Sequence, residues 1–182
     1  MIPTVISCYV TQAEKLKASC HQLNIPIEME CSSALQPEFI LKKLRELNTP
    51  VLWVEPTAQL MKVPHAECLE ECDFSVRVEE FLPKTHQARV LTHTVFARPT
   101  AEVMQLMQEW IVECKKGNPA ALRDALARHP QLCFRALPLS FSKIFHCDGL
   151  FISKDEVIVE HEEPSYGFRR EVHETCCHHR SH

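Results

Sequence analysis

The chain has 182 residues, of which 45% are hydrophobic and 24% are charged, and its formal net charge at pH 7 is −4. These values are ordinary for a globular protein, and they exclude wholesale disorder and a general basic surface that would attract nucleic acid. With only three glycines, the sequence cannot contain a Walker A loop or the glycine-rich dinucleotide-binding motif. P-loop NTPases and dinucleotide-binding Rossmann enzymes are therefore excluded.

The sequence also bears on the cellular compartment. No apolar run reaches the roughly 18 residues that a transmembrane helix requires. The segment Met1–Thr4 has neither the basic nor the apolar region of a secretory signal, so we expect a cytoplasmic protein. In that compartment the ten cysteines are expected to be reduced thiols.

The first third of the chain alternates short strands with helices. Residues 4–10 are rich in β-branched and aromatic side chains, which predicts a buried strand. A helix with an apolar stripe follows, then a short strand over 26–30 and a second helix over 36–47. The near-continuous apolar segment 50–55 predicts a third strand in a central, parallel position.

The remaining segments continue this pattern. Strands are predicted over 74–78 and 90–96, and the helical period is clearest over 99–116. Gly117 stands where a helix C-cap belongs, and a shorter helix begins after Asn118-Pro119. Short strands are then predicted near 132–136, 150–152 and 156–160.

Strand–helix–strand order through the first 55 residues predicts right-handed crossovers and a parallel sheet that is covered on both faces. The predicted fold class is α/β, a single-domain three-layer α/β/α sandwich with a mainly parallel central sheet. Ligands on such sheets bind beyond the carboxyl ends of the strands. The residues that follow Val10 and Val54 are therefore the first candidates for a functional site.

The segment 50–58, an apolar strand that runs into Glu55-Pro56-Thr57, resembles the strand that leads into the Asp-x-Asp motif of nucleotide-diphospho-sugar transferases of the GT-A fold. Other pieces resemble this family in the same order along the chain: the first helix (11–20), a helix start (36–41), a strand and turn (91–100), the helices through Trp110 and Leu122, and a late strand (157–161). The resemblance extends over about residues 4–170 and implies a GT-A-like domain of residues 1–170.

The resemblance also implies which residues form the site. A nucleotide sugar carries a diphosphate, which the family neutralises with Mn²⁺ or Mg²⁺ as a Lewis acid. The implied nucleotide-binding residues are Gln36, Glu55, Thr57, Arg169 and Arg170, and the implied metal ligands are Glu55 and His161.

The sequence departs from the family pattern at three of these positions. Glu55 replaces the first Asp, Thr57 replaces the second, and Gln36 replaces a Lys. We therefore expect a weakened donor and metal site. Each residue also has a structural explanation: Glu55 as a loop cap, Thr57 as a turn residue, Gln36 as part of a helix start, and His161 as a surface residue among glutamates.

The last twelve residues, 171–182, differ from the rest of the chain. Six thiol or imidazole groups fall within residues 173–182, and these groups are preferred ligands of Zn²⁺. The candidate Zn²⁺ ligands are His173, Cys176, Cys177 and His178. The alternative is a chain terminus of biased composition with adventitious metal affinity.

Three functional hypotheses follow. The first is a glycosyltransferase that uses a nucleotide-sugar donor at a weakened metal site. The second is a non-catalytic GT-A-like protein that binds another protein. The third is a metal-handling protein that acts through its Cys/His-rich tail.

Overall fold

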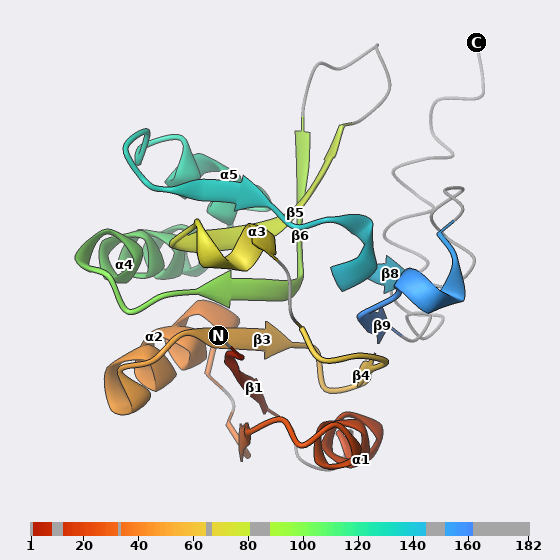
Figure 1. Ribbon diagram of the computed structural model, residues 1–182. Helices are drawn as coiled ribbons and strands as arrows, with labels where there is room; N and C mark the ends of the chain where they lie inside the picture. The colour runs from red at the N-terminus through yellow and green to blue at the C-terminus, as the bar shows by residue number, and fades with distance from the viewer. Residues whose placement is uncertain are drawn as a thin grey trace, which may run out of the picture.

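The computed structural model describes residues 2–8, 13–32, 34–64, 67–80, 88–144 and 152–161. They form a central six-stranded sheet with helices packed against it (Figure 1). The strands are β1 (Thr4–Cys8), β2 (Ile27–Glu30), β3 (Val51–Val54), β4 (Gln59–Leu60), β5 (Phe74–Glu80), β6 (Ala88–Ala97), β7 (Phe134–Ala136), β8 (Lys143–Ile144) and β9 (Val159–His161). The helices are α1 (Glu14–Gln22), α2 (Gln36–Leu47), α3 (Glu67–Glu70), α4 (Ala101–Lys115) and α5 (Ala121–Leu126), with 3₁₀ turns η2 (Leu139–Phe141) and η3 (Lys154–Glu156).

The central sheet has the strand order β2-β1-β3-β6-β5-β7. Strand β1 is parallel to both β2 and β3, and β7 is parallel to β5. Strand β6 is antiparallel to both of its neighbours, so it runs against the other five strands of this sheet. The prediction of an α/β fold with a mainly parallel central sheet is therefore confirmed.

A second, smaller sheet has the order β4-β9-β8. In Figure 1 the small sheet lies beyond the arrowhead of β3, that is, beyond the carboxyl end of this strand. Strand β4 follows β3 closely in sequence and pairs with β9, the last described strand. This pairing brings a residue 106 positions downstream, His161, to the edge where Glu55 follows β3.

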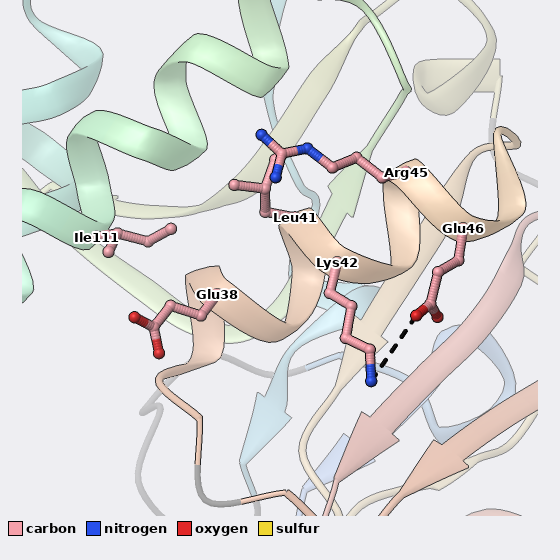
Figure 2. Close-up of a pocket in the computed structure, with 6 residues that line it drawn as sticks. All are labelled: Glu38, Leu41, Lys42, Arg45, Glu46 and Ile111. Atoms are coloured by element: carbon pink, nitrogen blue, oxygen red, sulfur yellow. Dashed lines mark ion pairs between the residues drawn. The ribbon is translucent and has the colours of Figure 1, made fainter.

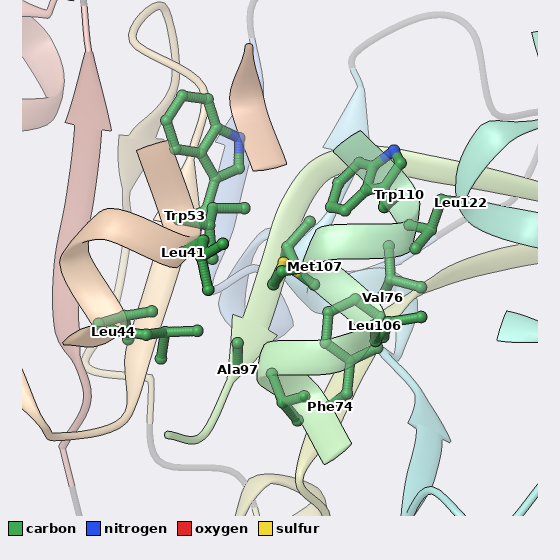
Figure 3. Close-up of a cluster of buried hydrophobic side chains, with 14 of the residues drawn as sticks. Leu41, Leu44, Trp53, Phe74, Val76, Ala97, Leu106, Met107, Trp110 and Leu122 are labelled. Atoms are coloured by element: carbon green, nitrogen blue, oxygen red, sulfur yellow. The ribbon is translucent and has the colours of Figure 1, made fainter. Parts of the chain in front are cut away.

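The helices and the small sheet cover the two faces of the central sheet, as a three-layer sandwich requires. On one face, α2, α4 and α5 bury apolar side chains against Trp53, Phe74 and Val76, as Figure 3 shows. Helix α4 contributes Leu106 and Met107, both fully buried. On the other face, α1, α3 and the small sheet pack together over Leu52, Val54 and Phe96.

Edge strand β2 and helix α2 are joined by charged side chains. The Lys43 side chain is only 9% exposed. Its Nζ lies 3.5 Å from a carboxylate oxygen of Glu30, 3.9 Å from one of Glu28 and 3.0 Å from one of Glu46. Lys42 contacts Glu46 as well, at 3.7 Å (Figure 2). A shallow groove of about 360 Å³ lies beside these charges, lined by Glu38, Leu41, Lys42, Arg45, Glu46 and Ile111.

The predicted elements agree with the structure except near the end of the described chain. The helix predicted over 36–47 has those bounds, and Gly117 adopts the left-handed backbone, φ 73°, that follows many helix ends. The strand predicted over 156–160 instead begins at Val159, because Lys154–Glu156 form a 3₁₀ turn. Of the strand predicted over 150–152, residues 150 and 151 lie outside the described ranges, and Ile152 belongs to no strand. Among the described residues, no helix is long and apolar enough to cross a membrane.

Candidate functional site

Glu55 lies directly after β3, at the carboxyl edge of the central sheet. The chain turns back immediately, because the Ala58 amide donates a hydrogen bond of 3.0 Å to the Glu55 carbonyl. Pro56 and Thr57 are the two central residues of this β-turn, and proline favours the first of these positions because its φ is fixed. Thr57 is therefore a turn residue adjacent to Glu55.

Strand β6 carries a bulge beside this turn. The consecutive β5 residues Val76 and Arg77 pair with Val95 and Leu91 of β6, so residues 92–94 are inserted against β5. On its other side β6 stays in register with β3, where Thr94 pairs with Val54. A bulge of this kind redirects side chains, and here it does so at the point where β3 ends.

The central bulge residue, His93, is bonded to Glu55. Its Nδ1 lies 2.7 Å from Glu55 Oε1, and its backbone carbonyl accepts a hydrogen bond of 3.0 Å from the Glu55 amide. The Glu55 carboxylate is 37% exposed and His93 is 17% exposed. The His93 imidazole thus holds one carboxylate oxygen, Oε1, and this hydrogen bond leaves the other oxygen, Oε2, available to another group.

The other oxygen of Glu55 faces His161, the last residue of β9. The His161 side chain is only 2% exposed, and its Nδ1 lies 3.7 Å from Glu55 Oε2, which is too long for a hydrogen bond. The other ring nitrogen, Nε2, lies 2.9 Å from the hydroxyl of Thr94. His161 Nδ1 is therefore a buried polar atom that has no hydrogen-bond partner.

The electrostatics keep both facing groups deprotonated near neutral pH. Burial acts to raise the pKa of Glu55, but the attraction of the nearby His161 and His93 rings and the hydrogen bond from His93 outweigh it and lower that pKa to about 2. Burial lowers the pKa of His161 and prevails over the opposing attraction of Glu55. A carboxylate and a neutral imidazole are the forms that bind metal ions.

This pair fits a divalent cation in part. Mg²⁺ holds its donors at about 2.1 Å, which places neighbouring donors about 3 Å apart, so the gap between Oε2 and Nδ1 needs to close by roughly 0.7 Å. The unpartnered Nδ1 of His161 is a buried donor atom that a cation would satisfy. Within the described part of the chain, no three His, Cys, Asp or Glu side chains form a metal cage, so further ligands would come from water or phosphate.

Gln36 also lies at this edge, as the first residue of α2. Its side-chain amide donates a hydrogen bond of 2.6 Å to the carbonyl of Thr92, the first residue of the β6 bulge. The amide therefore joins α2 to the bulge. The structure thus places Gln36, Glu55, Thr57 and His161 at one edge of the sheet, and their roles in ligand binding stay predictions. His161 is buried there, so its alternative interpretation as a surface residue is wrong.

The remaining predicted site residues lie outside the described ranges. These are Arg169 and Arg170 of the implied nucleotide site, and His173, Cys176, Cys177 and His178 of the tail. Their proposed roles stay predictions.

Two residues of the site, His93 and Thr94, were not predicted. Their segment, 91–100, resembles a family strand and turn, a resemblance that implies no role for either residue. The signal that was available is local: Thr92, His93 and Thr94 are three consecutive polar residues inside an otherwise apolar strand. A regular strand alternates its faces, so such a run predicts an irregularity that directs polar groups toward a site.

Comparison with known proteins gives matches among solved structures. No protein-family model matches the chain, and no curated protein sequence does. Among solved structures, the chain is similar to a glycosyltransferase involved in the glycosylation of the major capsid of PBCV-1, with a TM-score of 0.62 and 10% sequence identity. The match covers 97% of this chain and 100% of that chain. At this identity the likeness shows a shared, glycosyltransferase-like fold.

Proposed function

We propose that the protein is a glycosyltransferase-like enzyme that binds the diphosphate of a nucleotide sugar beside Glu55. The observation that carries the proposal is the pair formed by Glu55 Oε2 and the unpartnered, buried Nδ1 of His161, 3.7 Å apart. The pair lies at the carboxyl edge of a mainly parallel sheet, where such folds bind ligands. The glycosyltransferase-like fold supports the same assignment.

In this proposal Glu55 and His161 hold one divalent cation, Mn²⁺ or Mg²⁺, through Oε2 and Nδ1. The bound cation supplies Lewis-acid stabilisation of the diphosphate as the glycosidic bond breaks. Since the described part of the chain offers two ligands here, we expect weak cation binding alone and tighter binding when phosphate oxygens complete the coordination. Neither ligand has to lose a proton near pH 7.

Titration calorimetry with UDP- and GDP-sugars, with and without Mn²⁺, tests this proposal. We expect heat of binding for at least one nucleotide sugar, and a loss of about tenfold or more in affinity when Mn²⁺ is removed. His161→Gln and Glu55→Gln should abolish the dependence on Mn²⁺. The matched controls are His21→Gln on α1 and Glu102→Gln on α4, both at exposed positions. Absence of heat in every combination would overturn the proposal.

A second candidate, a non-catalytic protein that binds another protein, is favoured by a specific observation. The three positions that depart from the family pattern are all engaged within the chain: Gln36 with Thr92, Glu55 with His93, and Thr57 in a turn. The triple variant Gln36→Lys, Glu55→Asp and Thr57→Asp distinguishes the two functions. If the wild-type protein binds no nucleotide and the triple variant gains no nucleotide affinity, the glycosyltransferase function is excluded. Binding of another protein is then the remaining candidate function.

A further inference from the structure

The two atoms that face each other in the candidate site are each supported by a residue of the β6 bulge. His93 is hydrogen-bonded to Glu55, and the free oxygen of that carboxylate, Oε2, faces the site. Thr94 is hydrogen-bonded to His161, and the other ring nitrogen, Nδ1, faces the site as well. We propose that His93 and Thr94 are positioning residues that orient Glu55 Oε2 and His161 Nδ1 toward one divalent cation. This inference rests on the proposed function and deepens it.

The bulge explains how two adjacent residues can serve one site. In a regular strand, consecutive side chains point to opposite faces of the sheet, so residues 93 and 94 would diverge. Between Leu91 and Val95, however, β6 carries three residues where β5 carries none. His93 and Thr94 both reach the Glu55–His161 pair from there, and the rings of His93 and His161 lie 5.5 Å apart between centroids.

His93 determines which oxygen of Glu55 is available. A carboxylate on a free side chain rotates and exposes either oxygen. In this protein Oε1 accepts a hydrogen bond from His93 Nδ1 at 2.7 Å, which holds Oε2 toward His161. A carboxylate that is already oriented loses less conformational freedom when it binds a cation, so its affinity rises.

Thr94 fixes the orientation of the His161 ring through its contact with Nε2. For Nδ1 to bind a cation, the ring proton must be on Nε2, and a buried N–H requires an acceptor. The Thr94 hydroxyl lies 2.9 Å from Nε2 and is itself fully buried. A hydroxyl can accept a hydrogen bond from this N–H, and the contact holds the ring with Nδ1, rather than a ring carbon, toward Glu55.

The experiment measures Mn²⁺ binding to the full chain by electron paramagnetic resonance, in the presence of UDP or GDP. Thr94→Val removes the hydroxyl at nearly constant volume, and Thr94→Ser retains it. His93→Phe removes the donor but keeps a ring, and His93→Asn retains a donor near the position of Nδ1. We expect Thr94→Val and His93→Phe to weaken Mn²⁺ binding about 10- to 100-fold, and Thr94→Ser and His93→Asn to stay within about threefold of wild type.

The outcomes separate the two claims. Wild-type protein that binds no Mn²⁺ with either nucleotide would overturn the proposed function, and this inference with it. Wild-type binding that Thr94→Val and His93→Phe leave unchanged would overturn the positioning roles alone, as would equal losses in the conservative variants. Thermal unfolding shows that each variant is folded, and partly exposed His93 provides an independent pair if the buried Thr94 variants do not fold.

Discussion

Glu55 is the residue through which the site affects stability. Its pKa is about 2 in the folded protein, against an ordinary value of 4.5. Between these values an unfolded chain takes up a proton at this position while the folded chain does not. The contribution of Glu55 to stability is therefore complete above about pH 4.5 and is lost as the pH falls toward 2.

Replacement of the Glu55 carboxylate should make the free energy of unfolding depend less on pH under acidic conditions. We expect Glu55→Gln to show a smaller fall in the free energy of unfolding below pH 4.5 than wild type, because the linked proton uptake is removed. Urea unfolding at a series of pH values measures this slope. Glu102→Gln, at an exposed position on α4, should keep the wild-type slope. Identical slopes in Glu55→Gln and wild type would contradict the assignment.

At the scale of single elements, helix α4 offers a matched pair of substitutions. Leu106 is fully buried against the sheet, whereas Val112, on the same helix, is 50% exposed. Leu106→Ala should lower the free energy of unfolding by about 3 kcal/mol, because it leaves a cavity in a packed core. Val112→Ala should change it by less than about 0.5 kcal/mol. Chemical denaturation of both variants measures the difference, and equal effects would be evidence against this orientation of α4.

Helix α4 also shows why the regular elements could be predicted from the sequence. Its apolar residues recur at helical spacing, and burial of that stripe requires only a neighbouring sheet. The fully apolar β3 could be placed at the centre of the sheet for a similar reason. Local pattern therefore sufficed for these elements. It failed for β9, which pairs with β8 and also with β4, a segment far away in the sequence.

The site was predictable only in part, for the same physical reason. Glu55 was found because it follows a recognisable strand, and His161 because its segment resembles a family strand. The roles of His93 and Thr94 depend on the register of β6 against β3 and on a bulge against β5. Register arises from pairings across the whole sheet, and no single segment of sequence contains it.

At the scale of the whole molecule, the two apolar cores share the central sheet. Leu106 belongs to the core on one face and Leu16, on α1, to the core on the other. We expect Leu106→Ala and Leu16→Ala to destabilise one and the same cooperative transition, with effects that add to within about 0.5 kcal/mol in the double variant. Denaturation followed by both fluorescence and circular dichroism measures this. Two separate transitions would show that the faces unfold independently.

The charges on edge strand β2 bear on self-association. A free strand edge offers unpaired backbone groups to any other extended chain, which is a common route to aggregation. Another strand that approached β2 would have to pass Glu28 and Glu30, whose charges Lys43 and Lys42 hold in place at that margin. Charged side chains at an exposed strand edge oppose pairing with another strand, so the residues that attach α2 to β2 also place charge at this edge of the described sheet.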